Sequence, residues 1–166
     1  MNDLTPVVDV IKQMVAAYQE LLKVQEQKRD ALIAGRVDDL PDILQEELKA
    51  VAATQKLEAE RQSALETAFG AAASGGDWTL EKLQSVAGPV HRLQVRAAGE
   101  ALQQTVRQVQ NLHELNKKLV GQSLQYVQNT LDLMAGENTM MTPTYGRPDA
   151  SPYGDGSPRR MFDSKV

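Results

Sequence analysis

The sequence contains no cysteine and few aromatic residues, and each scarcity narrows the classes of protein to consider. The lack of cysteine excludes disulfide bonds, thiolate metal sites and thiolate catalysis, and it is compatible with a reducing compartment. Aromatic residues make up only 4% of the chain although hydrophobic residues make up 42%, so a core must be built mainly from aliphatic side chains. A thin aliphatic core is typical of helical bundles.

Long apolar segments are also missing. No run approaches the roughly 20 apolar residues that a membrane-crossing helix needs. The opening Met1-Asn2-Asp3 is not followed by the basic and apolar regions of a signal peptide. The net charge of −4 argues against nucleic acid as the main partner, because phosphate binding needs a basic face. We therefore expect a cytoplasmic protein that neither spans a membrane nor binds nucleic acid.

Motifs for catalysis or cofactor binding are absent from the sequence as well. His91 and His113 are separated by about six helical turns, so they cannot share a metal ion within one chain. Gly75-Gly76 lacks the lysine of a nucleotide-binding loop. No histidine stands three or four residues from the paired glutamates near positions 46 and 58, as a di-iron bundle requires. We predict no enzymatic activity, no catalytic residue, no cofactor and no bound metal.

What the sequence does contain is apolar residues at spacings of three and four, which predict long helices. We expect the first helix at about residues 4–34, with Gly35 as its left-handed stop. Polar residues, Gln25 and Lys28, continue the spacing and should weaken the apolar seam near its end. The seam of this helix is predicted to contain Val7, Ile11, Met14, Tyr18 and Leu21.

A second helix is expected at about 39–70 and a short third helix at 79–87. The segment from Thr54 to Ser63 is highly charged, so we expect it to be solvated or poorly packed, with Leu57 as its only large apolar anchor. Trp78 precedes the short helix and has two interpretations, a packing plug at the end of the bundle or a binding contact. The seam of the second helix is predicted to contain Leu40, Ile43, Leu44, Leu48, Val51, Leu57, Leu65 and Phe69.

The last predicted helix, at 90–135, is the longest and has the densest apolar pattern, between Leu112 and Leu131. Asn116 falls on or beside this pattern, as either a register-fixing residue or an exposed edge residue. The predicted fold class is all-α. We expect residues 1–135 to form an elongated, coiled-coil-like, antiparallel up-down bundle of three long helices and one short helix.

The tail, residues 136–166, is rich in glycine, proline and serine and is predicted to be disordered. It contains two Tyr-Gly elements, at Tyr145-Gly146 and Tyr153-Gly154. A repeated aromatic residue in such a tail is typical of a short recognition motif.

Four segments in this order resemble the FlgN-type flagellar export chaperones. They are Lys28-x-x-Ala31-Leu32-x-x-Gly35-x-x-x-x-Leu40, then Leu57-Glu58-x-x-Arg61, then Asn116-x-x-Leu119-x-x-x-Ser123-Leu124-x-Tyr126-Val127, and finally Tyr153-Gly154-Asp155-Gly156. The third and fourth segments in tandem are the most specific. The tail here is longer than in that family, and it has two Tyr-Gly elements, so either could match the family element.

The resemblance implies a cytoplasmic, non-enzymatic chaperone of flagellar type III export. Such proteins bind the C-terminal segments of hook–filament junction (hook-associated) proteins, prevent their premature association and deliver them to the membrane-embedded export gate, where they reside transiently. The cargo-binding residues would be Val109, Leu112, Asn116, Leu119, Tyr126, Val127, Leu131 and Met134. The residues that contact the cytoplasmic domain of the export gate would be Tyr145, Gly146, Tyr153 and Gly154.

The alternative hypothesis is a structural or regulatory coiled-coil protein that oligomerises through its apolar seam. Size measurement combined with cargo pull-down distinguishes the two hypotheses. A stable oligomer that does not bind a junction protein would favour the alternative.

Overall fold

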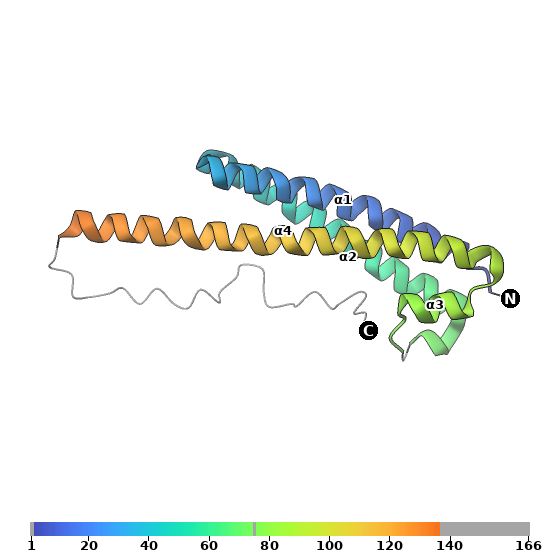
Figure 1. Cartoon of the computed structure of the whole chain (residues 1–166). Helices are drawn as coiled ribbons and strands as arrows, with labels where there is room; N and C mark the ends of the chain where they lie inside the picture. Colours follow the sequence, from blue (N-terminus) through green and yellow to red (C-terminus); the bar gives the residue numbers. More distant parts are fainter. Residues whose placement is uncertain (1, 75, 137–166) are drawn as a thin grey trace. The chain divides into compact units, whose positions relative to one another are not determined.

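The computed structural model describes residues 2–74 and 76–136, and every regular element within them is helical. The predicted all-α fold class is confirmed for this part of the chain. Short 3-10 turns, Val37–Asp39 and Gly70–Ala73, follow the first two helices. The four α-helices are α1 (Thr5–Ala34), α2 (Leu40–Phe69), α3 (Leu80–Val86) and α4 (Pro89–Ala135) (Figure 1).

Local sequence signals account for the ends of these helices. Gly35 follows α1 with a φ of 68°, a left-handed conformation that glycine adopts without steric cost, and Arg36 N donates to Ala31 O at 2.9 Å. Thr79 caps α3, since its hydroxyl accepts a hydrogen bond from Lys82 N at 3.2 Å. Pro89 is the first residue of α4. A backbone N–H at this position would have no acceptor within the helix, so proline, which lacks that group, is tolerated there.

The backbone forms two compact units, Met1–Leu119 and Val120–Val166. All the buried side chains of the described residues belong to the first unit. The described part of the second unit is the last part of α4, which continues as a helix to Ala135. The boundary that the sequence suggests between bundle and tail, at residue 135, stays a prediction.

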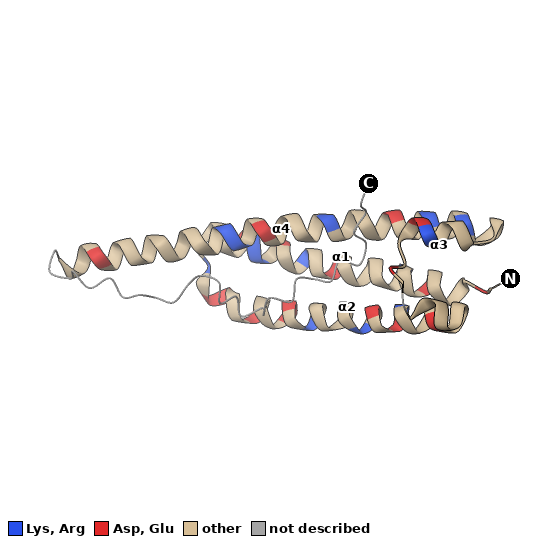
Figure 2. Ribbon diagram, turned by 90° about the horizontal axis from the view of Figure 1, so that it is seen from below, with Lys and Arg blue, Asp and Glu red and all other residues tan. Residues whose placement is uncertain are grey.

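Side-chain contacts establish that α1 and α2 run in opposite directions. Gln25 Nε2 donates a hydrogen bond to Glu47 Oε1, while Tyr18, two turns earlier in α1, lies beside Thr54 and Glu58, which come later in α2. The two helices lie side by side, joined by the short turn at residues 35–39 (Figures 1 and 2). A connection this short favours an antiparallel pair of helices.

Within the first unit, α4 runs parallel to α1. Thr5 Oγ1 lies 3.3 Å from His91 Nε2, and twenty residues later in α1 the Gln25 carbonyl accepts a hydrogen bond from Asn116 Nδ2 at 2.9 Å. The residue numbers of the contacting pairs therefore increase together along both helices, as they do when two helices are parallel. The order α1, α2, α4 is up, down, up.

One part of this core is wholly apolar, and we call it the apolar half. It consists of residues 4–14 and 65–102, whose packed aliphatic side chains gain the usual stabilisation of burial, about 1.5–3 kcal/mol for each large side chain. Its buried side chains are Leu4, Val7, Val8, Ile11, Met14, Leu65, Ala73, Trp78, Leu80, Leu83, Ala87, Val95, Ala98 and Leu102.

The other part, which we call the polar half, consists of residues 18–61 and 105–116. Gln25 and Lys28, where the seam of α1 was predicted to weaken, are buried there, so the helical spacing continues inward with polar side chains. The apolar side chains buried in the polar half are Leu21, Ala31 and Val109. The polar side chains buried in it are Gln25, Lys28, Glu47, Thr54, Arg61, Thr105 and Asn116.

The predicted seam of α2 is wrong at Leu44 and Leu48, which are 38% and 58% exposed. Leu65 is buried, and the half-buried members are Leu40, Ile43, Val51, Leu57 and Phe69. The other buried positions of α2 are seven residues apart, at 47, 54 and 61, and they carry polar side chains that find partners. Because hydrophobic periodicity reads only apolar residues, it missed these polar members of the inward face.

The expectation of a solvated or poorly packed segment between Thr54 and Ser63 is wrong at Thr54 and Arg61, which are 5% and 8% exposed. The residues at 55, 56, 59, 60 and 63 are exposed, and Leu57 is half-buried. The Arg61 guanidinium is bound in a bidentate manner by Glu58, with distances of 2.9 Å from Nε and 2.7 Å from Nη2. A paired guanidinium of this kind is tolerated in a packed seam because its donors are satisfied.

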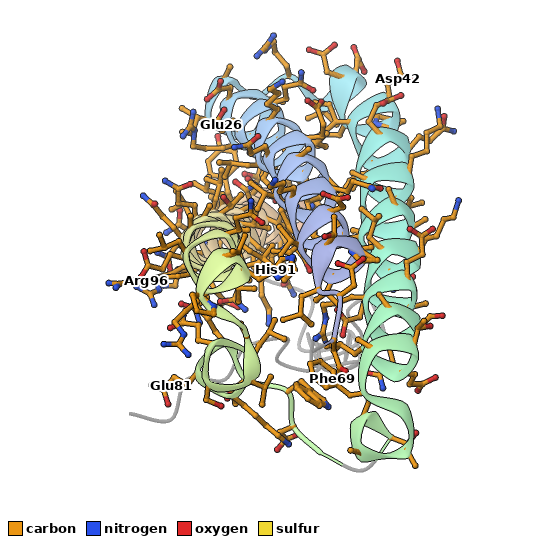
Figure 3. The ribbon with its side chains drawn as sticks, turned by 90° about the vertical axis from the view of Figure 1, so that its right-hand side faces the viewer. Glu26, Asp42, Phe69, Glu81, His91 and Arg96 are labelled. Carbon is orange, nitrogen blue, oxygen red and sulfur yellow. The ribbon has the colours of Figure 1, made fainter. Side chains whose placement is uncertain are left out.

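Trp78 packs at the end of the apolar half. Its ring stacks on that of Phe69, which lies at the end of α2 (Figure 3), with 4.3 Å between the ring centroids. Lys82 Nζ lies 4.7 Å from the centroid of the Trp78 ring. The side chain is only 9% exposed. This geometry agrees with the packing-plug interpretation of Trp78.

Candidate protein-binding surface

The last part of α4 exposes a row of large apolar side chains. Asp132 is the only charged residue between Val120 and Ala135, in contrast to the interspersed acidic and basic residues along α2 (Figure 2). The exposed fractions rise from 36% at the first member of the row to 80% at the last. We call this row the apolar stripe, and its members are Val120, Leu124, Val127, Leu131 and Met134.

The stripe occupies one face of the helix. Its members are separated by four, three, four and three residues, which brings them into line at about 3.6 residues per turn. Tyr126 and Leu133, 72% and 84% exposed, lie outside the stripe, nearer to the polar side of the helix. The opposite face carries polar side chains, namely Lys118, Gln122, Gln125, Asn129 and Asp132. This part of α4 is therefore strongly amphipathic while its apolar face is open.

The structure divides the residues predicted to bind cargo into three groups. Val109 and Asn116 are buried, at 8% and 1% exposure. Leu112 and Leu119 are half-buried. The four that are freely exposed are Tyr126, Val127, Leu131 and Met134.

Two exposed members of the apolar stripe, Val120 and Leu124, are not among the predicted cargo-binding residues. The signal that would have found them was present, because Val120 and Leu124 keep the spacing of four and three that connects Asn116 to Val127. Sequence spacing alone does not say which members of a continuous pattern are covered by another helix.

Asn116 is the register-fixing type of residue rather than an exposed edge residue. Its Nδ2 donates to the backbone oxygen and to Oε1 of Gln25, each at 2.9 Å. Gln25 in turn donates to Glu47, and Lys28 Nζ lies 3.0 Å from Glu47 Oε2. We call these four residues, Gln25, Lys28, Glu47 and Asn116, the polar layer.

The polar layer is buried and contains one atom, Asn116 Oδ1, that lacks a hydrogen-bond partner among the described residues. Its members are between 1% and 7% exposed, so their hydrogen bonds replace water almost completely. The Oδ1 atom of Asn116 is buried without a hydrogen-bond partner in the described part of the chain. An unpaired buried acceptor carries a desolvation penalty of about 1–3 kcal/mol, so the layer is held in place at some cost.

The histidines do not form a metal site in the region that the structure describes. His91 contacts Thr5, and its Nε2 lies 3.9 Å from Asp3 Oδ1 at the start of the chain (Figure 3). The hydrogen bonds of Thr5 lower the pKa of the Asp3 carboxyl, and His91 adds a smaller effect in the same direction. No group of three or more metal-ligating side chains occurs among residues 2–74 and 76–136.

The residues predicted to contact the export gate, Tyr145, Gly146, Tyr153 and Gly154, lie outside the described residues. Across the described helices, none is both long and apolar enough to cross a membrane.

Comparisons with known proteins place the chain in a family. Residues 1–151 match the model of the family described as FlgN protein. This match includes Tyr145-Gly146 and ends before Tyr153-Gly154. The chain is also 21% identical over 160 residues to YvyG of Bacillus subtilis (strain 168), a protein described as uncharacterized, with 96% of this chain and 97% of that protein covered. No solved structure matches the chain. Because the family match covers most of the sequence, the chain belongs to the FlgN family of flagellar export chaperones.

Proposed function

We propose that this chaperone binds the C-terminal segments of hook–filament junction proteins through the last part of α4 and delivers them to the export gate. The observation that carries the proposal is the apolar stripe, an amphipathic helical face whose large side chains are exposed in the free chain. Contiguous exposed apolar surface of this kind marks interaction sites in proteins that stay in solution.

The chemistry of the stripe fits an amphipathic cargo segment. Side chains at spacings of three and four are the anchors by which one helix lies against another, and the stripe offers five of them in four turns. The single charge, Asp132, lies on the opposite face, so cargo would meet an uninterrupted apolar surface. Covering the apolar face of the cargo also prevents its premature association with other copies.

Delivery to the gate is assigned to the tail. A short aromatic motif suits a contact that must form and release, because ordering a flexible segment on binding limits affinity. The Tyr145-Gly146 element lies within the family match and Tyr153-Gly154 beyond it, which favours Tyr145 as the gate contact. In this proposal the protein acts in the cytoplasm and resides only transiently at the export apparatus.

Cargo binding is tested by titrating the full-length chain with purified C-terminal peptides of junction proteins. We expect Val127→Ala and Leu131→Ala to weaken binding about tenfold each, since truncating a central apolar anchor costs more than about 1 kcal/mol. Leu119→Ala, which removes a half-buried side chain, should weaken binding less. The matched controls, Gln125→Ala and Asn129→Ala on the polar face, should bind like the wild type.

Unchanged affinity in all three apolar variants, with helicity preserved, would rule out the stripe as the cargo surface. A stable wild-type oligomer that binds none of the peptides would favour the alternative coiled-coil function.

The division of labour is tested with the cytoplasmic domain of the export gate. Tyr145→Ala should impair gate binding more than Tyr153→Ala, and neither should change cargo affinity. Deleting residues 136–166 should likewise spare cargo binding. Equal loss of cargo and gate binding would contradict separate sites.

A further inference from the structure

Two of the residues predicted to bind cargo, Val109 and Asn116, are not accessible in the free chain. Both lie on the buried face of α4, and Asn116 is hydrogen-bonded to α1. In the sequence they precede the apolar stripe at the same helical spacing, because 109, 116, 120, 124 and 127 fall on one side of an α-helix. The face that is proposed to bind cargo is thus continued upstream by residues that are closed in the core.

We propose that the polar layer is a latch, meaning that it holds α4 against α1 in the free chain. Cargo binding then opens the seam between α1 and α4 from Val109 onward while the apolar half stays packed. This inference rests on the proposed cargo binding. Opening would add Val109, Leu112 and Asn116 to the surface that the stripe begins, so the cargo segment would be held along a longer face.

The hydrogen bonds of the layer are arranged for such an opening. Lys28 and Glu47 bind each other, and Gln25 binds Glu47, so three members of the layer remain joined within the α1–α2 hairpin when α4 leaves. On α4, Asn116 joins the layer through the hydrogen bonds of its Nδ2 to the backbone oxygen and Oε1 of Gln25. The separation of α4 breaks these bonds and leaves the Lys28 ammonium paired with the Glu47 carboxylate.

Hydration favours opening in the polar half over the apolar half. When α4 separates near Asn116, the polar side chains of the layer regain water, and the unpaired Asn116 Oδ1 gains a partner that it lacks in the closed form. In the apolar half the same movement would expose Val95 and Leu102, which are both 0% exposed, and nothing would compensate the lost burial. Local openings follow the segments with least buried apolar area.

The opening itself is tested by thiol labelling, for which the absence of native cysteine is an advantage. Val109→Cys and Ala98→Cys form a matched pair, because both positions lie on α4 and both are 8% exposed. In the full-length free chain we expect a thiol reagent to label Cys at 109 at least about tenfold faster than Cys at 98. Equal rates, or faster labelling at 98, would overturn the latch whether or not the chain binds junction proteins.

The coupling to cargo is tested by replacing the bond across the seam with an apolar contact. Gln25→Leu with Asn116→Leu removes both partners of the bond across the seam. Glu47 loses the hydrogen bond from Gln25 but stays paired with Lys28. We expect this double variant to slow labelling at 109 and to weaken binding of junction-protein peptides about tenfold. The control is Thr105→Val, a buried substitution of similar size in α4 whose hydroxyl bonds only to Ala101 O in the same helix, and it should bind like the wild type.

Thiol labelling and peptide binding together distinguish a failure of the proposed opening from a failure of the proposed cargo binding. Rapid labelling of the Val109→Cys variant, combined with no binding of junction peptides by the wild-type chain, would contradict the proposed function and leave the opening established. A double variant that labels slowly and still binds with wild-type affinity would overturn the coupling between latch and cargo.

Discussion

The apolar half and the polar half are built by the same three long helices, yet they bury side chains of opposite kinds. In the apolar half the buried residues are aliphatic or aromatic, whereas the polar half is held together around an ion pair, an arginine–glutamate pair and the amide of Asn116. Apolar burial gives stability without specifying partners closely, while buried polar groups demand particular partners and thereby define register. The difference indicates that one half anchors the bundle and the other aligns its helices.

The largest expected effect tests the anchoring role of the apolar half. Leu102→Ala removes a side chain with 0% exposure and should lower the free energy of unfolding by about 3 kcal/mol, from lost burial and the cavity that remains. The matched control is Leu48→Ala in α2, where the same truncation at 58% exposure should cost less than about 0.5 kcal/mol. Urea denaturation followed by circular dichroism measures both. Similar losses would contradict the observed burial of the two positions.

A smaller effect is expected where α3 packs on α4 in the apolar half. A Cβ atom at Gly99 would clash with the side chain of Leu80, so Gly99→Ala should lower the free energy of unfolding by about 1 kcal/mol even though alanine favours the helix. Gly121 is also within α4, but no atom lies within 4 Å of an added Cβ there. Gly121→Ala should therefore raise helicity and should not lower stability. If Gly121→Ala destabilised the protein as much as Gly99→Ala, the loss at Gly99 could not be attributed to close packing against Leu80.

The smallest effect concerns pH and the polar half. Burial raises the pKa of Tyr18 above its ordinary value of about 10, and the charge of Glu58 adds to the rise, while Thr54 opposes it. The folded state thus favours the neutral phenol. The associated stability is fully present below about pH 10 and is lost as the pH rises through the raised pKa.

The variant Tyr18→Phe has no group to ionise, so its unfolding free energy should fall less steeply than that of the wild type as the pH rises above about 10. Denaturation series at several alkaline pH values measure the two slopes. Parallel slopes would mean that Tyr18 titrates alike in the folded and unfolded chains.

The sequence predicted the class of fold and much of α1 because the relevant signals are local. Proline near helix starts, Gly35 at a helix end and the alternating steps from Val7 to Leu21 all act within a few residues. The spacing of Val127 and Leu131 in the sequence also indicated part of the apolar stripe. The prediction failed where local pattern and tertiary partner disagree, as on α2, where Leu48 is exposed and Glu47 buried.

The amino-acid sequence by itself determined that this protein is helical, where its helices begin and end, and that the end of α4 has an apolar face, because these properties depend on backbone preferences and helical spacing. Only the tertiary structure decided which members of that face are covered and which polar residues lie inside. Burying Gln25, Glu47 and Asn116 is favourable only when each finds its partner on another helix. Such partners are far apart in the sequence and meet only when the bundle has formed.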